Sequence, residues 1–413
     1  MKRRPDLLDE SAAPGIEVIQ LTLEENIPSS HIYMESQIFT PDSKRLVLHR
    51  SAQSHGKNPL DPDHQFLLCD IEDDCRCTPL THEMGATAPS VSPDGRFLYY
   101  FIDETRVNGG CLTLKRVGLD GGNRETILVL DAGLPGTKFR PSLIYSLSTI
   151  SSDGKRLAVS AFLGDGQSKE QPSGLMVFDL EKPSVHLAIQ GPTWINMHPQ
   201  YSRSLEPEHA HDILIQENHG YRSDEEGRVV RKPDGKGTDI HVIRDDGTNF
   251  RTMPWGRDGN ESCQGHQCWR GRSPWAITST HTRQPSEQQL IEGIATVDDG
   301  HLGILTPGGQ RNDLSREFPE PCFYHFATDM AGQKLITDAG PLDQGWRIFM
   351  AELGEPGCEP LQNVRFLLNP RNGPYAQAPV GCHVHPFLSP DGNLAFFNSN
   401  ESGISQAYMV RGI

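Results

Sequence analysis

A turn motif followed by a run of apolar residues recurs along the whole chain. The clearest copy is "VSPDGRFLYYF" from Val91, in which Ser-Pro-Asp-Gly precedes the apolar run. Proline, aspartate and glycine favour tight turns, and the run after them is typical of a β-strand. Seven copies, some of them decayed, have their turn residue at Asp42, Asp94, Asp153, Ser204, Arg272, Ala331 and Asp391. One four-stranded propeller blade with long loops needs about this spacing of roughly fifty to sixty-five residues.

The segments between the copies predict further strands and no amphipathic helix. "SGLMVFDLEKPSVHLAI", for example, is an apolar strand, an acidic turn and another strand. The last copy ends after three strands, and Ile16–Thr22 is a spare strand before the first copy, so that pairing the two closes a ring. We therefore predict an all-β fold, a seven-bladed β-propeller over residues 16–413 closed by the N-terminal strand. Residues 1–15 are predicted to be a flexible tail, and Tyr221–Gly237 a solvated loop.

Histidine occupies the same position in four successive copies. Six residues before the turn residue, the chain has Ser36, Ala88, Leu147, His198, His266, His325 and His385. This position falls on the strand expected to line the central channel of the propeller, where equivalent residues converge. His383 lies two residues before His385, and residues at this separation on a strand point to the same face. The sequence therefore predicts a histidine cluster on one side of the channel.

Two interpretations of this cluster remain open. A histidine on a strand is more often a structural residue, so a purely hydrogen-bonded cluster is one alternative. Protonated imidazoles would repel one another, however, and neutral imidazoles are ligands for transition metals. Three imidazoles also leave coordination positions open, which suits a catalytic ion. The pattern favours a metal centre.

Composition narrows the range of partners. The 413-residue chain has a net charge of −16, which argues against binding nucleic acid or an anionic membrane surface. Nine cysteines at irregular spacing suit a reducing compartment. The basic start at Lys2 leads into no hydrophobic segment, and no run of eighteen apolar residues occurs. We therefore expect a cytoplasmic protein with no membrane span and no obligate protein partner. An acidic substrate would need local positive charge from arginines or a metal.

Five stretches, in order along the chain, resemble the oligogalacturonate lyase family of pectin degradation. They are "HIYMESQIFTPDSKRLVL", "INMHPQYS", "NESCQGHQCW", "PCFYHFATDMAG" and "CHVHPFLSPDGNLAFFNS". The resemblance implies a seven-bladed propeller with a divalent ion, most of all Mn²⁺, in the channel. It implies metal ligands at His266, His383 and His385, and a general base at His198.

Two positions depart from the family pattern. The ligand glutamine of the family falls at Val380 here, so we predict Gln377 as the fourth ligand. The catalytic arginine of the family falls at Gly174, and we predict that Arg222 contacts the substrate in its place, with a solvent-exposed loop arginine as the alternative. His325 is predicted to bind the substrate or to assist the leaving oxygen, with a packed strand residue as its alternative.

The implied reaction is β-elimination of a short acidic oligosaccharide, with oligogalacturonate as the first choice and a 4,5-unsaturated uronate as product. Removal of the C5 proton requires that the adjacent carboxylate be neutralised, which a metal ion does, and a neutral imidazole near pH 7 is a suitable base. Another metal-dependent sugar-acid enzyme and a non-catalytic binding propeller are the alternatives. The sequence has neither a Gly-x-Ser-x-Gly elbow nor a phosphate loop, which excludes serine-nucleophile and nucleotide chemistry of those types.

Overall fold

The strands of the protein form a propeller of antiparallel sheets. The computed structural model describes residues 1–52, 58–106, 110–224, 227–231, 238–253, 261–282, 301–305, 311–314, 323–342, 345–354, 361–373 and 382–413. The helical content of these residues is one 3₁₀ turn, η1 (Pro5–Leu7), and no α-helix occurs among them. Within the same ranges, no helix is long and apolar enough to cross a membrane.

Three sheets of four strands come first in the chain. The first contains β3 (Ser29–His31), β4 (Arg45–Arg50), β5 (Gln65–Asp70) and β6 (Arg76–Pro79). The second contains β7 (Ala86–Val91), β8 (Phe97–Glu104), β9 (Cys111–Gly118) and β10 (Glu125–Leu130). The third contains β11 (Arg140–Ile150), β12 (Arg156–Gly164), β13 (Ser173–Asp179) and β14 (Ser184–Gly191).

The second half of the chain contributes to sheets of eight, four and five strands. The fourth has eight strands, β15 (Gln200–Tyr201), β16 (Asp212–Asn218), β19 (Thr238–Arg244), β20 (Arg251–Thr252), β21 (Glu261–Trp269), β22 (Ala276–Thr282), β23 (His301–Leu305) and β24 (Arg311–Asp313). The fifth contains β25 (Phe326–Thr328), β26 (Lys334–Leu342), β27 (Gly345–Glu352) and β28 (Gln362–Leu368). The sixth contains β1 (Lys2–Arg3), β2 (Glu17–Gln20), β29 (Phe387–Leu388), β30 (Leu394–Ser399) and β31 (Gln406–Arg411). A separate hairpin joins β17 (Arg222–Ser223) and β18 (Val229–Arg231).

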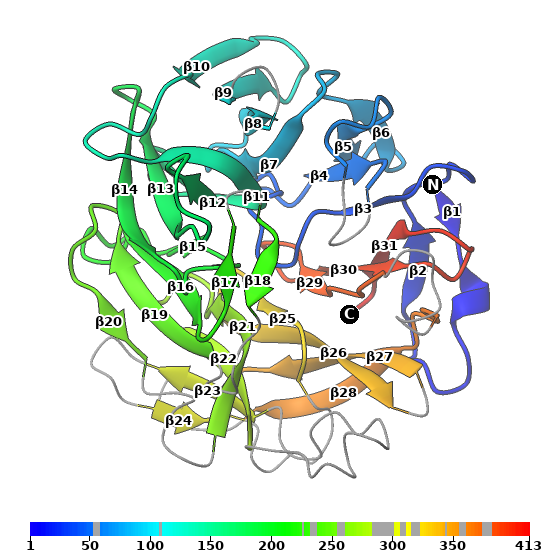
Figure 1. Cartoon of the computed structure of the whole chain (residues 1–413). Helices are drawn as coiled ribbons and strands as arrows, with labels where there is room; N and C mark the ends of the chain where they lie inside the picture. The colour runs from blue at the N-terminus through cyan, green and yellow to red at the C-terminus, as the bar shows by residue number, and fades with distance from the viewer. Residues whose placement is uncertain are drawn as a thin grey trace.

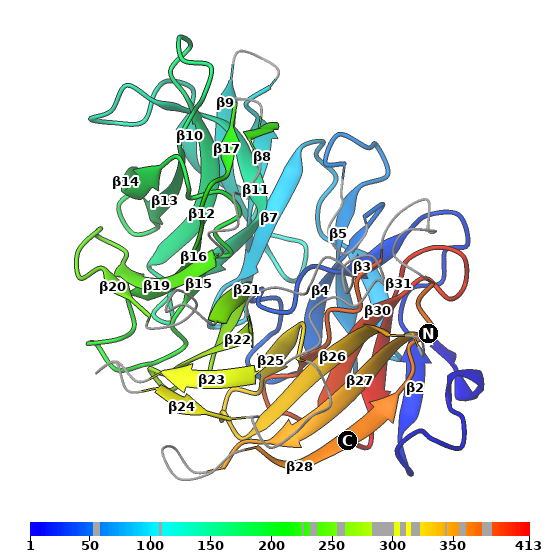
Figure 2. The same cartoon turned by 60° about the horizontal axis from the view of Figure 1, so that its bottom comes forward.

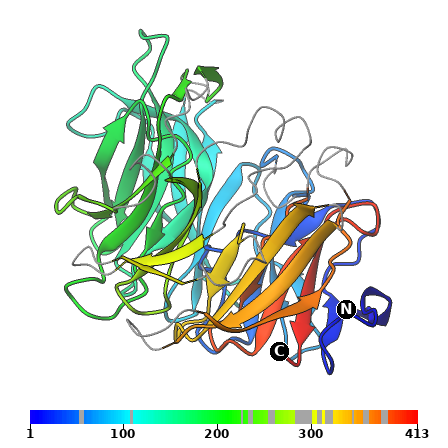
Figure 3. The ribbon, with the colours of Figure 1, turned by 90° about the horizontal axis from the view of Figure 1, so that it is seen from below.

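The sheets are arranged around a common centre (Figure 1). The first strands of neighbouring sheets contact one another, β7 with β11, β11 with β15, and β25 with β29. Turned views show the sheets standing side by side, with both chain ends beside the sixth sheet (Figures 2 and 3). The prediction of an all-β propeller is confirmed.

The number of separate sheets differs from the prediction. The sequence predicts seven blades, whereas the described residues form six large sheets. The difference lies in the eight-stranded sheet, which contains the repeats with turn residues Ser204 and Arg272. Its two halves are joined by one register pair between β19 and β21, Thr238 with Cys263. The predicted count of seven separate sheets is therefore not confirmed.

The recurring turn sets the start of the second strand in each repeat. In the second sheet, Ser92 Oγ donates to Asp94 Oδ1 over 2.6 Å, and Gly95 closes the turn with a φ of 69°. Glycine tolerates this left-handed conformation without steric cost. Ser151–Gly154 and Ser389–Gly392 repeat the same Ser-to-Asp bond. The strands that follow are almost wholly buried, because each sheet packs between two neighbours.

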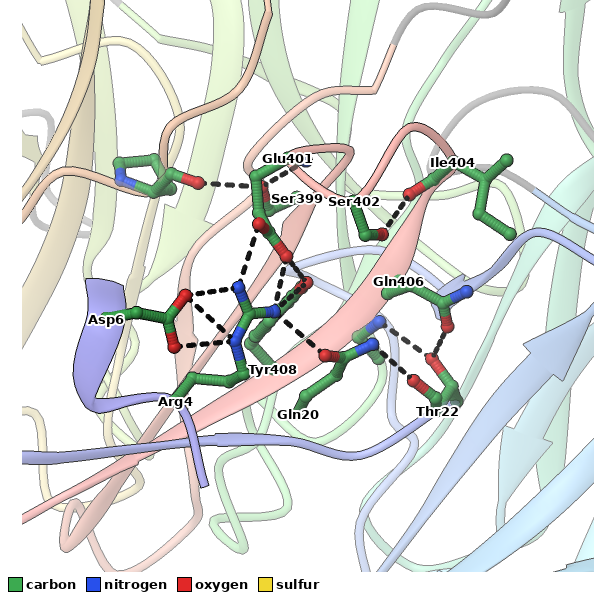
Figure 4. A network of polar contacts seen from close by, with 12 residues as sticks. Arg4, Asp6, Gln20, Thr22, Ser399, Glu401, Ser402, Ile404, Gln406 and Tyr408 are labelled. Carbon is green, nitrogen blue, oxygen red and sulfur yellow. Dashed lines mark hydrogen bonds and ion pairs between the residues drawn. The ribbon is translucent and has the colours of Figure 1, made fainter. Parts of the chain in front are cut away.

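Residues 1–15 pack against the sixth sheet and are not free of it. Arg4 is 7% exposed; its guanidinium donates to Gln20 Oε1 and to Glu401 Oε2, each over 2.9 Å (Figure 4). Leu7, in η1, joins the largest hydrophobic core cluster. These contacts contradict the prediction that residues 1–15 form a flexible tail. A charged side chain is buried only where it is paired and hydrogen-bonded, as Arg4 is here.

Candidate functional site

Three of the positions that the repeats align share an unusual backbone conformation. The φ angle is 47° at Ala88, 47° at His198 and 44° at His385. Residues other than glycine seldom adopt this left-handed region. At Ala88 the register of β7 against β8 breaks between Thr87 and Ser90, as expected for a bulge. The shared conformation supports the alignment of the repeats.

Three histidines converge on one point. His325, His383 and His385 each offer a ring nitrogen, and these atoms all lie within 4.8 Å of one another. The ring centroids of His325 and His385 are 4.3 Å apart, and those of His383 and His385 are 5.1 Å apart. His325 and His385 are fully buried, whereas His383 is half-buried. Three imidazoles at this spacing, open on one side, fit a divalent transition-metal ion.

His325 is oriented by a buried carboxyl group. Asp338 Oδ1 accepts a hydrogen bond of 2.8 Å from the His325 backbone N–H, and Asp338 Oδ2 lies 2.8 Å from His325 Nδ1. His325 Nε2 therefore faces the cluster, 3.5 Å from His383 Nδ1. Metal-binding histidines are commonly fixed in this way by a carboxyl group on the other ring nitrogen.

His266 lies beside the converging group without being part of it. Its ring centroid is 4.5 Å from that of His325 and 4.9 Å from that of Tyr324. Its Nδ1 is buried and has no hydrogen-bond partner among the described residues. The group in the structure thus differs from the predicted ligand set by containing His325, which the sequence assigns to substrate, in place of His266. Gln377, the predicted fourth ligand, lies outside the described residues.

His198 stands across Tyr33 from the three converging histidines. The Tyr33 ring is 5.1 Å from the His198 ring and 4.7 Å from the His385 ring. His198 Nδ1 shares a hydrogen bond of 3.0 Å with Tyr33 Oη, and His198 Nε2 shares one of 3.0 Å with Asn196 Oδ1. Glu35 Oε2 is 3.9 Å from His198 Nδ1. The structure therefore separates His198 from the candidate metal ligands by one aromatic ring.

Burial keeps these imidazoles neutral at neutral pH. Desolvation lowers the pKa of His198 to about 4 and that of His31 to about 3. Desolvation and the neighbouring imidazoles lower the pKa values of His266 and His325 well below the usual value. Burial also raises the pKa of Asp338 to about 8. Neutral imidazoles are the form that binds a metal or accepts a proton.

We expect the metal-free protein to lose stability as the pH falls from about 7 to 5. Histidine in an unfolded chain has a pKa of about 6.5, so the unfolded state binds protons in this window that the buried imidazoles of the folded state do not. The free energy of unfolding then decreases by up to about 1.4 kcal/mol per pH unit for each such histidine. The buried carboxyl groups of Asp338 and Glu35, whose pKa values are raised, act in the opposite direction, because the folded state holds their protons in this window. The histidines with lowered pKa values, including His31, His198, His266 and His325, outnumber them and set the sign. Urea unfolding at several pH values measures this slope. A free energy of unfolding that stays constant over the window contradicts burial of neutral imidazoles.

Arg222 and Gly174, the two positions that bear on the catalytic arginine of the family, lie on β17 and β13 and not in the histidine cluster, and Val380 lies outside the described residues. Arg222, on β17, approaches Glu170 at 3.9 Å and donates to the Tyr221 carbonyl over 2.6 Å. Gly174, on β13, has no room for a larger side chain, because an added Cβ would lie 2.8 Å from Leu163 Cδ1 and 3.0 Å from the Ile189 carbonyl oxygen. An arginine at this position would disturb the packing of the third sheet.

Comparison with solved structures extends over the whole chain. An oligogalacturonate lyase in complex with manganese is 17% identical, with a TM-score of 0.71, and the match covers 98% of this chain and 94% of that one. An oligogalacturonate lyase from Vibrio parahaemolyticus is 17% identical, with a TM-score of 0.67 and coverage of 97% and 95%. A structure from a study of two prolyl endopeptidases is 12% identical, with a TM-score of 0.52, and the match covers 93% of this chain and 50% of that one.

The sequence comparisons add no family assignment. No protein-family model matches the chain, and no curated protein matches it. The structural likeness, at this level of identity, concerns the fold. At that level the predicted resemblance to oligogalacturonate lyases is confirmed.

Proposed function

We propose that the protein is a metal-dependent lyase that cleaves short uronate-containing oligosaccharides, with oligogalacturonate as the first choice. The observation that carries the proposal is the convergence of His325, His383 and His385 within 4.8 Å, with a neutral histidine, His198, on the other side of one aromatic ring. The whole-length fold match to oligogalacturonate lyases, one of them in complex with manganese, supports the same assignment.

His325, His383 and His385 are the residues that would hold the ion, with His266 beside them. The three ring nitrogens are buried or half-buried donors of one chemical kind, which suits Mn²⁺, Fe²⁺, Co²⁺, Ni²⁺ or Zn²⁺ better than Mg²⁺ or Ca²⁺. Such an ion, when bound, supplies positive charge beside the substrate carboxylate and so acidifies the C5 proton. It also supplies local attraction for an acidic substrate on a chain with a net charge of −16.

His198 is the residue that takes the C5 proton in this proposal. Its pKa of about 4 leaves the ring neutral at pH 7, so one nitrogen has a lone pair available. In the structure Asn196 Oδ1 accepts from His198 Nε2, so the ring carries its hydrogen on Nε2 and the Nδ1 lone pair accepts from the Tyr33 O–H. In this proposal the exposed Asn196 gives way to the substrate and the hydrogen moves to Nδ1, where Tyr33 Oη accepts it, so that Nε2 is free to accept the C5 proton.

Further features belong to the same proposal. The eight-stranded sheet consists, we infer, of two four-stranded blades, which gives a ring of seven. The single pair Thr238–Cys263 between β19 and β21 supports this division, because β16 and β19 are paired along their whole length. Pairing of β2 with β31, from Glu17–Arg411 to Gln20–Tyr408, supports closure of the ring by the N-terminal strand. We also propose a cytoplasmic site of action on small acidic oligosaccharides, without nucleic acid, membrane or an obligate protein partner.

An absorbance assay tests the reaction directly. Enzyme loaded with Mn²⁺ is expected to generate an ultraviolet-absorbing 4,5-unsaturated uronate from di- and trigalacturonate, and chelator-treated enzyme is expected to generate none. Glucuronate-containing counterparts serve as matched substrates, because this chain has Gly174 where the family pattern places the catalytic arginine. If only the glucuronate series gives product, the substrate contains glucuronate and the proposed reaction stands. Absence of product from both series overturns the lyase assignment and favours another metal-dependent sugar-acid enzyme.

A further inference from the structure

A second group of metal-binding side chains lies on the fourth sheet, outside the histidine cluster described above. Glu217 is on β16, and His219 follows that strand directly. Asp239 and His241 are on the neighbouring β19. Glu217 and Asp239 are direct partners in the strand register, and residues two apart on a strand share a face. All four side chains therefore project from the same face of the sheet.

The donor atoms of this group are spaced like the ligands of one ion. His219 Nε2 lies 3.0 Å from Asp239 Oδ2 and 3.6 Å from Glu217 Oε2, and His241 Nε2 lies 3.4 Å from Glu217 Oε2. Ligand atoms about 2.1 Å from a tetrahedral ion lie about 3.4 Å from one another. Glu217, Asp239 and His241 each place one donor atom within 4.8 Å of the others.

His241 points a nitrogen without a hydrogen-bond partner into this group. The residue is 3% exposed, and its Nδ1 shares a hydrogen bond of 3.1 Å with Thr252 Oγ1. Its Nε2 is buried and makes no well-aligned hydrogen bond among the described residues, although Glu217 Oε2 lies 3.4 Å away. Rings of Trp194 and Phe250 flank the imidazole, with centroids 5.3 and 4.8 Å away. A buried nitrogen without a partner is costly unless something binds it.

Two carboxylates directly opposite one another on a sheet also repel unless a cation lies between them. We propose that Glu217, His219, Asp239 and His241 bind a divalent transition-metal ion of the Zn²⁺ or Mn²⁺ class, which accepts mixed imidazole and carboxylate ligands. The ion would bind His219 Nε2 and Asp239 Oδ2 in place of the hydrogen bond between them, and it would also bind His241 Nε2.

The second ion has a structural consequence for the proposed active site. Glu217 also accepts a hydrogen bond from Thr193 Oγ1, and Asn218 Nδ2 donates to the Ile195 carbonyl over 2.6 Å. Residues 193–198 run from these contacts to His198. An ion at this group therefore fixes one end of the segment that carries His198, and it joins β16 to β19 at the base of residues 219–237.

Equilibrium dialysis against Zn²⁺ alone, with the bound metal counted by atomic emission, tests the inference on the full chain. The double variant Asp239→Asn/His241→Ala is expected to bind one equivalent of Zn²⁺ fewer than the unchanged protein. The double variant His325→Ala/His383→Ala is expected to lose one equivalent as well. His211→Ala is the matched control, because it removes a histidine from the same region whose ring contacts Asp245 and Asp153 through opposite nitrogens, 2.7 and 3.4 Å away. This control is expected to bind as much Zn²⁺ as the unchanged protein.

The two metal proposals fail in different ways. Equal Zn²⁺ binding by Asp239→Asn/His241→Ala and the unchanged protein overturns the second site. Loss of an equivalent in that variant, with none lost in His325→Ala/His383→Ala, supports the second site and contradicts the histidine centre. If the double variant Asp239→Asn/His241→Ala does not fold, the second site is tested by thermal unfolding of His325→Ala/His383→Ala, which lacks two residues of the histidine cluster and keeps the second site. Zn²⁺ is expected to raise the melting temperature of this variant, and no rise overturns the inference.

Discussion

Replacing His198 by alanine is expected to lower turnover by about two to four orders of magnitude, the usual contribution of a positioned general base. The ring is neutral at pH 7, because burial lowers its pKa to about 4, and it is held by Tyr33 and Asn196. Bound metal is expected to stay unchanged, since Tyr33 separates His198 from His385. Initial rates on digalacturonate and metal content of the same preparation measure both effects.

His186→Ala is the matched control for this substitution. His186 lies on β14, an outer strand, and its Nε2 contacts the Asp245 carbonyl oxygen at 2.8 Å. Its loss is expected to leave turnover within about twofold of the unchanged enzyme, as for surface substitutions with effects near 0.5 kcal/mol. Loss of metal in His198→Ala would make His198 a ligand, and turnover unaffected by the substitution would remove it from the mechanism.

The fold was predictable because its signal repeats. The Ser-Pro-Asp-Gly turn forms the same internal hydrogen bond in several repeats, from Ser92 to Asp94 and from Ser389 to Asp391, so each copy marks the start of a strand. The division into sheets was not predictable in the same way. It depends on one backbone pairing, Thr238 with Cys263, which joins two repeats and leaves no trace in the apolar pattern.

The position of the histidine cluster was predictable for the same reason, whereas its partners were not. Tyr33, Glu35 and Asp338 belong to the site, yet none occupies the repeated histidine position. Tyr33 contacts His198, which lies 165 residues further along the chain, and no local pattern encodes this contact. Asp338 was detectable in principle, because a carboxyl group within the apolar strand "KLITDAG" needs a partner when it is buried.

Asp338 also distinguishes His325 from His266. The register of β25 with β26, Phe326 opposite Thr337, brings Asp338 opposite His325, and the two hydrogen bonds of 2.8 Å follow from it. Sequence spacing treats His266 and His325 as equivalent. The structure distinguishes them, because only His325 joins His383 and His385 within 4.8 Å. The ligand roles of both residues remain predictions that substitution can separate.

We expect His325→Ala to abolish binding of Mn²⁺ at the histidine cluster, and His266→Ala to leave it bound. His325 presents Nε2 to the cluster because Asp338 holds Nδ1, whereas His266 contacts the cluster only through ring packing against His325. Asp338→Asn keeps the size of the side chain and is expected to weaken Mn²⁺ binding about 10- to 100-fold, the usual cost of losing a group that orients a ligand. Mn²⁺ titration of each variant measures these affinities.

His64→Ala controls for the cost of removing any buried imidazole. His64 is 3% exposed, directly precedes β5 of the first sheet and bonds the Ala86 carbonyl oxygen at 3.1 Å, far along the chain from the cluster. This variant is expected to bind Mn²⁺ as the unchanged protein does, even if it is less stable. Retention of Mn²⁺ by His325→Ala together with its loss in His266→Ala would restore the ligand set that the sequence motifs imply. It would also mean that the Asp338–His325 pair serves the substrate or the packing of the fifth sheet, because the carboxyl group would then orient a ring that binds no metal.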